Sequence, residues 1–424
     1  MSLLWLAACG WFRSGPPQDT WPDPEPVTSP ADSQVKEDTG PIELTGSTLI
    51  LVSVDGFSQA YWESADMPVL KGWAEQGTRA EALIPVYPTK TFPNHYSQVT
   101  GLYPSHHGIV DNSFRDPVSG EYFDMQTLDP KWWLGEPIWI TAERQDVNTA
   151  TCFWPGSEVS FDGDRPRYYL PYDGSMSGRE RVDQVLEWLD LPDDKRPRLI
   201  TLYFSDVDSA GHSYGPGAHA VYQELRAVDG HLSLLEQGLR ERGILDEVDL
   251  MVVSDHGMQS FSRDRVELLD DHLDLATVEV YSWAQHTTLS AIAPATTEQV
   301  LEALSGLEHA RCHAKADTPE HLHYGDSERI PEIVCLPDDG WVLSSHSYFD
   351  NSTVYSSGGT HGWDPAYPAM HGVFVARGPH IQQGRVHPAF DQVQLYNLMA
   401  SILELTPQSN DGDPSEVSDM LVSE

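Results

Sequence analysis

Four apolar runs along the chain have the composition of strands that are buried on both faces of a parallel sheet. They are rich in Leu, Ile and Val, and they cover residues 48–54, 198–204, 250–254 and 372–376. Apolar side chains also recur at helical spacing from Val182 to Leu189, and from Val221 to Leu239 before Gly243. Strands alternating with helices predict an α/β fold, with a mostly parallel central sheet covered by helices on both faces.

The region between the third and fourth runs interrupts this alternation. We therefore expect one large domain over residues 47–410, with a cap-like insert at about residues 261–343. The insert holds Cys312 and Cys335, whose proximity in the chain favours a disulfide between them if the protein is exported. Cys152 lies in an apolar stretch, so we expect it to be a buried free thiol.

The N-terminus has features of an export signal. Residues 1–9 contain a short apolar run and end in LAAC, which resembles the processing box of bacterial lipoproteins, with Cys9 as the lipidated residue. Residues 10–46 are rich in Pro, Ser, Asp and Thr and predict a disordered linker, and residues 411–424 form an acidic tail. We therefore expect an exported protein, lipid-anchored at the bacterial cell envelope, either in the periplasm or at the cell surface. Because no Lys or Arg precedes the apolar run, an upstream start or an accidental match stays open.

The charge of the chain limits its partners. The sequence has 65 acidic and 25 basic residues, for a formal net charge of −40. Such a surface repels the phosphate backbone, so duplex nucleic acid is not an expected partner. An anionic small molecule requires bound cations that reverse the field locally. No apolar run in the sequence is long enough to span a bilayer.

Acidic and imidazole side chains follow three of the apolar runs, and one more lies in a glycine-rich loop. They are Asp55 after the first run, Asp208 and His212 after the second, Asp255 and His256 after the third, and His361 in residues 358–362. Functional side chains of open α/β sheets gather beyond the carboxyl ends of strands. Three Asp and three His divide into two sites with N and O ligands, which suit zinc. Taken singly, each residue has the alternative interpretation of a turn former or a hydrogen-bonded core side chain.

A hydroxyl lies close to the start of a predicted helix. Residues 83–86 predict a short strand, and residues 95–100 predict helical turns that end at Gly101, so Thr91 falls near an N-cap. Pro93 fits the first turn, where its missing N–H costs nothing. The helix dipole there favours a group that becomes an alkoxide beside a phosphate, although an ordinary Thr cap is the alternative.

Several motifs resemble those of the nucleotide pyrophosphatase/phosphodiesterase family of the alkaline phosphatase superfamily. They are residues 88–96 (PTKTFPNHY), 100–104 (TGLYP), 107–112 (HGIVDN), 135–139 (GEPIW), 153–158 (FWPGSE) and 211–216 (GHSYGP). The resemblance extends from about residue 49 to residue 378, with the motifs in family order. It implies an alkaline phosphatase-like fold and a hydrolase with two zinc ions per subunit.

The resemblance also implies roles for individual residues. Thr91 matches the nucleophile, and Asn112 matches the residue that, with the Thr91 N–H, binds a non-bridging phosphate oxygen. The implied ligands are Asp208, His212 and His361 for one zinc, and Asp55, Asp255 and His256, together with the Thr91 oxygen, for the other. Phe92 and Tyr172 match an aromatic pair that sandwiches a base, and Trp154, Pro155 and Tyr203 match the pocket wall. His95, His106 and His107 are left over, and we expect them to support the fold or the ligands.

The implied reaction is hydrolysis of nucleotide pyrophosphate and phosphodiester bonds through a phosphothreonine intermediate, which releases nucleoside 5′-monophosphates. Aromatic side chains that stack on a base favour a nucleotide substrate over bare phosphate. Three alternatives stay open: a phosphodiesterase for choline-lipid or glycerophosphodiester substrates, a phosphomonoesterase, and a nucleotide-binding lipoprotein with negligible turnover. The sequence leaves the oligomeric state open.

Overall fold

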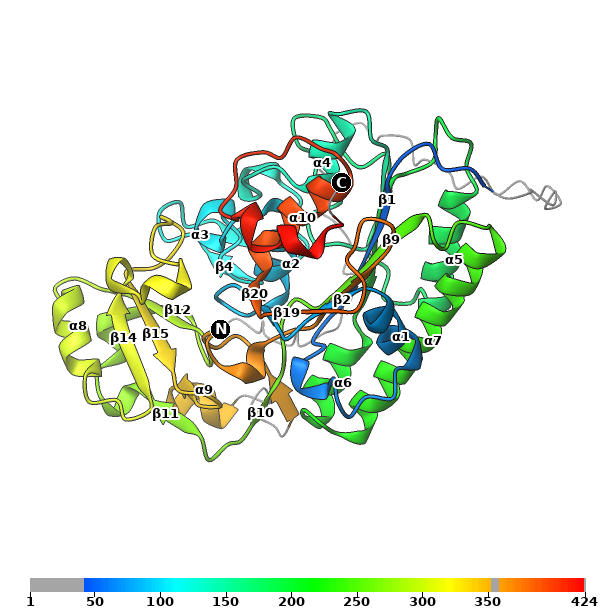
Figure 1. The fold of residues 1–424 in the computed structure, drawn as a ribbon. Coiled ribbons are helices and arrows are strands. Elements are labelled where there is room, and N and C mark those ends of the chain that lie inside the picture. Colours follow the sequence, from blue (N-terminus) through cyan, green and yellow to red (C-terminus); the bar gives the residue numbers. More distant parts are fainter. Residues whose placement is uncertain (1–41, 352–357, 423–424) are drawn as a thin grey trace.

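The computed structural model of the protein describes residues 42–351 and 358–422, and its centre is an eight-stranded sheet (Figure 1). Its order is β19 (Arg385–His387), β2 (Thr78–Ala80), β18 (Phe374–Arg377), β9 (Val248–Val253), β1 (Thr48–Val54), β8 (Leu199–Phe204), β6 (Thr149–Cys152) and β7 (Tyr168–Leu170). Only β18 in this sheet runs against its neighbours. The four predicted strands are present, with ends shifted by at most two residues, and the mostly parallel sheet is confirmed.

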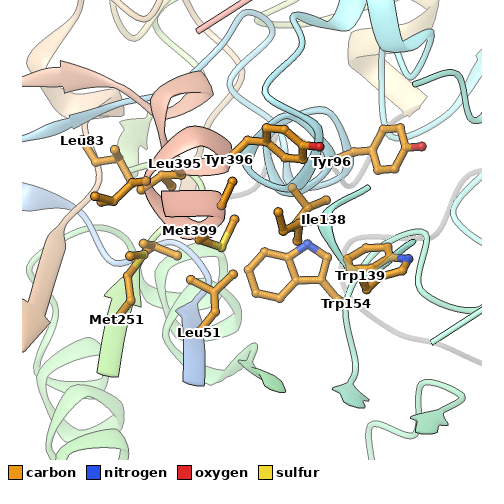
Figure 2. Close-up of a cluster of buried hydrophobic side chains, with 14 of the residues drawn as sticks. Leu51, Leu83, Tyr96, Ile138, Trp139, Trp154, Met251, Leu395, Tyr396 and Met399 are labelled. Atoms are coloured by element: carbon orange, nitrogen blue, oxygen red, sulfur yellow. The ribbon is translucent and has the colours of Figure 1, made fainter. Parts of the chain in front are cut away.

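The central strand β1 shows why these runs are continuously apolar. All seven of its residues are buried, because helices cover both faces of the sheet. Leu49 and Leu51 lie in the core cluster that also contains side chains of α2 (Thr91–Thr100), α4 (Ile138–Glu143) and α10 (Leu395–Ile402). Figure 2 shows Leu51 in this cluster, with Trp139 and Met399.

The other face of β1 packs on a second set of helices. Ile50, Val52 and Val54 share a core cluster with these helices. The helices are α1 (Pro68–Gln76), α5 (Gly178–Leu189), α6 (Asp206–Tyr214) and α7 (His219–Glu241). Both helices that the apolar spacing predicts, α5 and α7, are therefore confirmed, and the fold is the expected layered α/β arrangement.

The region expected to form an insert has its own sheet and its own core. Its strands pair in the order β12 (Val278–Ser282), β13 (Thr287–Ala291), β15 (Ile333–Pro337) and β14 (Ala310–Ala314), with α8 (Thr297–Leu304) packed on them. Figure 1 shows this part, largely yellow, to one side of the central sheet. Two short pairs of strands lie between the insert and the rest of the domain: β11 (Val266–Leu268) with β16 (Val342–Ser344), and β10 (Gln259–Phe261) with β17 (Gly358–Thr360). Helix α9 (His346–Asn351) lies between β16 and β17 in the chain.

The remaining short elements flank the helix that begins at Thr91. They are β3 (Leu83–Ile84) paired with β20 (Phe390–Asp391), α3 (Pro104–His107), and the hairpin of β4 (Phe114–Arg115) and β5 (Tyr122–Phe123).

The three cysteines among the described residues have the expected states. Cys312 and Cys335 lie opposite each other on β14 and β15 and form a disulfide, so this prediction is confirmed. Cys152 is a buried free thiol, and burial raises its pKa to about 12. A thiol with so high a pKa is a packing residue rather than a nucleophile.

The chain ends differ in part from the expectation. The predicted signal over residues 1–9 and most of the linker, up to residue 41, lie outside the described residues. Residues 42–46 pack on the domain: Ile42 and Leu44 contact the core, and the Ile42 N–H donates to the carbonyl of Arg242. In the predicted acidic tail, Val417 and Met420 are buried, so its described part packs on the domain. Among the described residues, no helix combines the length and apolarity needed to cross a membrane.

Candidate active site

Three neighbouring parallel strands bring the predicted ligands to one edge of the sheet. Asp55 follows β1, Asp255 and His256 follow β9, and α6, which begins directly after β8, carries Asp208 and His212. His361 follows β17. The structure gathers these six side chains in two groups, within which the candidate ligand atoms lie within 4.8 Å of one another. The groups are Asp55, Asp255 and His256, and Asp208, His212 and His361, which is the division that the family resemblance implies.

Local geometry explains how the groups form. Asp208 and His212 are four residues apart on α6, so one turn of helix places both side chains on the same face. Gly56, directly after Asp55, has a φ of +67°. A Cβ atom at Gly56 would lie 2.9 Å from the Cα of Asp208, so only glycine permits this close approach of the β1 end to α6.

Hydrogen bonds orient the three imidazole rings. Each Nδ1 faces a backbone carbonyl: that of Gly359 for His212 at 2.9 Å, that of Gly257 for His256 at 2.9 Å, and that of Thr89 for His361 at 2.8 Å. A carbonyl only accepts, so Nδ1 carries the proton and Nε2 is directed into the site. Fixing the ring through its other nitrogen is the usual arrangement of metal-ligating histidines.

The inward-facing atoms are crowded in a way that bound cations would relieve. The Nε2 atoms of His212 and His361 are 3.1 Å apart, and Nε2 of His256 lies 2.9 Å from Oδ2 of Asp255. Within the described part of the chain, Oδ1 of Asp55 and Oδ2 of Asp255 are buried and accept no hydrogen bond. Burial, followed by the nearby carboxylates of Asp255 and Asp208, raises the pKa of Asp55 well above its usual value. Two divalent cations with N and O ligands would satisfy these atoms, so the donor set fits zinc.

Thr91 lies beside one of the groups. Its Oγ1 is 3.4 Å from Nε2 of His256. Thr91 is the first helical residue of α2 and Lys90 is the N-cap, so the prediction of Thr91 near the cap is correct to within one residue. The first N–H groups of a helix have no partner inside the helix, which makes this position suitable for an anion.

A network of side chains fixes the loop around Thr91. The Phe92 N–H donates to Oδ1 of Asn112 at 2.8 Å, and the Asn112 N–H donates to the Asp111 carboxylate at 2.6 Å. Lys90 Nζ donates to both oxygens of Asp111, at 2.8 and 2.9 Å. Burial raises the pKa of Asp111, but Lys90 and His286 outweigh it and bring the value to about 2. Sequence reasoning missed Lys90 and Asp111, although both lie inside the recognised motifs.

The predicted substrate-binding aromatic residues contact other side chains of this region. The Phe92 ring packs against Trp133, and the Tyr172 ring packs edge-on against Phe153 and Tyr203. The Tyr203 hydroxyl donates to Oδ2 of Asp55 at 2.6 Å, so this predicted wall residue also contacts a candidate ligand. A base sandwich between Phe92 and Tyr172 stays a prediction.

The FWPGSE motif contributes the other two predicted wall residues. Trp154 is buried, and its Nε1–H donates to the carbonyl of His95. Pro155, next in the chain, is only partly buried. Trp154 therefore contacts α2 through His95, and a direct contact of either residue with a substrate stays a prediction.

The three histidines in and beside the motifs that received no ligand role, His95, His106 and His107, form hydrogen bonds or ion pairs with other parts of the chain. His95 is buried, with Nε2 2.7 Å from Ser53 Oγ and Nδ1 2.9 Å from the carbonyl of Thr91. His107 is buried and accepts from the Ile109 N–H at Nδ1, and burial lowers its pKa to about 3. His106 pairs with Asp411 near the surface.

Comparisons with known proteins agree with this geometry. Residues 49–364 match the family model described as type I phosphodiesterase/nucleotide pyrophosphatase. The chain is 36% identical to the venom phosphodiesterase CdcPDE of Crotalus durissus collilineatus over 90% of the chain and 47% of the relative. It is also 36% identical to ectonucleotide pyrophosphatase/phosphodiesterase family member 1 of Homo sapiens, over 93% of the chain and 44% of the relative. The chain thus spans about half the length of these curated relatives.

A solved structure supports the fold. An inactive threonine-to-alanine variant of murine ectonucleotide pyrophosphatase/phosphodiesterase 5, in complex with AMP, superimposes with a TM-score of 0.82 at 31% identity. The match covers 89% of this chain and all of that one. The predicted alkaline phosphatase-like α/β fold is therefore confirmed. The chain belongs to the type I phosphodiesterase/nucleotide pyrophosphatase family, within the alkaline phosphatase superfamily.

Proposed function

We propose that the protein hydrolyses nucleotide pyrophosphate and phosphodiester bonds through a covalent threonine intermediate and releases nucleoside 5′-monophosphates. The observation that carries the proposal is the position of Thr91, 3.4 Å from His256 and at the first turn of α2, beside two groups of candidate metal ligands. The named activities of the relatives and the AMP complex of the murine relative support it.

In the proposed reaction, the Thr91 hydroxyl loses its proton to solvent, and its oxygen attacks phosphorus opposite the leaving group. The bond from phosphorus to the leaving oxygen breaks, and the nucleoside phosphoryl group is transferred to Thr91. A water then gives up a proton and attacks phosphorus from the vacated side, the bond to the Thr91 oxygen breaks, and that oxygen takes up a proton again. Because Oδ1 of Asn112 is held by the Phe92 N–H, the amide nitrogen of Asn112 is left to donate to a non-bridging oxygen, together with the Thr91 N–H.

The residues that would hold the metal are Asp55, Asp255 and His256 for one ion, and Asp208, His212 and His361 for the other. Two zinc ions bound there would lower the pKa of the Thr91 hydroxyl and of water, and would neutralise charge on the leaving oxygen. The chain itself supplies the orientation, because the Nδ1 hydrogen bonds of the three histidines direct every Nε2 inward.

The aromatic surroundings support a nucleotide substrate. Tyr172 is half-buried and packs against Tyr203, whose hydroxyl is bonded to the candidate ligand Asp55. A base that stacks on Tyr172 would therefore lie near the reacting phosphorus. Base–aromatic stacking contributes about 1–3 kcal/mol per base in nucleic-acid binders, which corresponds to a gain in affinity of about 5- to 150-fold.

A comparison of three chromogenic substrates tests the proposed function. We expect the purified protein with added zinc to hydrolyse the nitrophenyl ester of thymidine 5′-phosphate faster than nitrophenyl phosphate or nitrophenyl phosphorylcholine, by at least about fivefold on the stacking estimate above. Fastest turnover of the phosphorylcholine ester would assign the protein to choline-lipid or glycerophosphodiester substrates, the alternative that keeps the same centre. Fastest turnover of the monoester would contradict a diesterase.

We also propose that the protein is exported and anchored to a membrane through lipid on Cys9, the only membrane contact that we propose. The Cys312–Cys335 disulfide supports export, because such bonds persist in oxidising compartments. Small-molecule nucleotides are the proposed partners, and the net charge of −40 argues against duplex nucleic acid.

A further inference from the structure

Two adjacent residues of the insert contact two different segments of the candidate active site. Gln285 and His286 lie in the connection between β12 and β13, far in sequence from both the Thr91 segment and the His361 loop. Gln285 contacts the loop that carries His361, and His286 contacts the network behind Asn112.

Gln285 holds the backbone of a candidate metal ligand. Its Nε2 donates to the carbonyl of His361 and lies 3.3 Å from Oγ1 of Thr360. Gly362 has a φ of +126°, and a Cβ atom there would lie 2.6 Å from Cγ of Gln285. The glutamine therefore packs directly on the His361 loop, and the glycine makes that contact possible.

His286 contacts the hydrogen-bond network around Thr91 through Asp111. Nδ1 of His286 lies 3.1 Å from Oδ2 of Asp111, and the side chain is only 2% exposed. Asp111 accepts from the Asn112 N–H, and Asn112 accepts from the Phe92 N–H. A short chain of hydrogen bonds thus runs from the insert to the first turn of α2.

Aromatic rings fix the orientation of His286. Tyr87 and Tyr324 pack against its ring edge-on, with centroid distances of 5.3 and 5.5 Å. Its Nε2 is buried and has no hydrogen-bond partner within the described residues. Among the described residues, His286 therefore makes its side-chain hydrogen bond through Nδ1.

The backbone before these two residues is held in an unusual conformation. Ala284 has a φ of +77°, in the left-handed region that residues with a Cβ seldom occupy. It exchanges two backbone hydrogen bonds with Leu343, at 2.9 and 3.1 Å. Such conformations persist where the surrounding structure enforces them and often lie beside functional sites.

We propose that Gln285 and His286 are positioning residues, by which the insert orders both halves of the active site. Gln285 sets the His361 loop for metal binding, and His286 sets Asn112 and the start of α2 through Asp111. The His286 half of the proposal rests on the proposed function, because it concerns turnover. The Gln285 half concerns only the affinity for metal. If the insert only covers the site, neither hydrogen bond affects metal binding or turnover.

The Gln285 half is tested with zinc alone. Gln285→Met keeps the length and the packing on Gly362 but removes the donor. Loss of such outer contacts usually weakens metal affinity 10- to 100-fold. In competition titrations with a chromogenic chelator, we expect one of two zinc ions to bind about tenfold more weakly than in the wild type. Equal affinity for both ions would overturn this half of the proposal.

The His286 half is tested by kinetics on the zinc-loaded enzyme. His286→Leu keeps the bulk between Tyr87 and Tyr324 and removes Nδ1, so kcat on the thymidine diester should fall about tenfold, with KM within about twofold. His286→Asn places an amide donor at the position of Nδ1 and should restore most of the loss, because Nε2 makes no hydrogen bond. A wild-type kcat in His286→Leu, or no rescue by His286→Asn, would contradict positioning through Asp111.

The outcomes separate this proposal from the proposed function. Thermal unfolding of each variant shows whether it folds, and if His286→Leu does not, the zinc titration of Gln285→Met decides the proposal. If the wild type binds two zinc ions but hydrolyses none of the three esters, the proposed function fails while the Gln285 result still stands.

Discussion

Replacing Thr91 by alanine should abolish turnover of nucleotide diesters. Loss of a catalytic nucleophile typically lowers kcat by a factor on the order of 10⁴–10⁶. Thr91 is the first residue of α2, and its side chain does not cap the helix, so alanine should leave the helix intact. The measurement is kcat on the nitrophenyl ester of thymidine 5′-phosphate, with zinc content and the unfolding midpoint determined on the same preparation.

A serine at this position is the matched control. Thr91→Ser keeps the hydroxyl beside His256 and removes only a methyl group, so turnover should remain readily measurable. A Thr91→Ala enzyme that works within about tenfold of the wild type would show that water attacks phosphorus directly, because a lost nucleophile costs far more.

Removing divalent cations should have an effect of similar size. Asp55, Asp208 and Asp255 are all buried at one edge of the sheet, and without cations their charges repel one another. We therefore expect chelation to lower kcat by at least about 10³-fold and to lower the unfolding midpoint, because a metal that binds only the folded state stabilises it. Added zinc should restore both quantities.

A pair of histidine variants shows whether the loss of activity on chelation arises from the two groups of candidate metal ligands. His361→Ala removes a candidate ligand and should reduce zinc binding from two ions to one tightly bound ion. His106→Ala removes a partly exposed histidine that pairs with Asp411, outside both groups, and should bind zinc as the wild type does. Full zinc-dependent activity in His361→Ala would contradict the assignment of this group.

Much of the site could be predicted because its signals are local in sequence. Asp55, Asp208 and Asp255 each come directly or soon after an apolar run, and a parallel sheet brings the ends of such strands together at one edge. The helix that begins at Thr91 was likewise visible from Pro93 in its first turn and from Gly101 at its end. The grouping of the ligands came from the family resemblance, and the structure has the same grouping.

Other features depend on contacts between distant segments, which no local pattern reveals. His286 reaches Asp111 across 175 positions of the chain, and Gln285 reaches the His361 carbonyl across 76. Tyr203 lies within a strand and was predicted only as a pocket wall, because nothing in sequence shows that its hydroxyl meets Asp55. The start of the domain was placed at residue 47 because Ile42 and Leu44 lack any periodic pattern, yet both pack on the core.

The stereochemical course at phosphorus tests the central claim most directly. A single diastereomer of the nitrophenyl ester of thymidine 5′-phosphorothioate would be hydrolysed in ¹⁸O-labelled water, and the configuration of the product determined. Two successive in-line displacements, first by Thr91 and then by water, predict overall retention. Inversion would mean a single displacement by water and would contradict a covalent intermediate on Thr91.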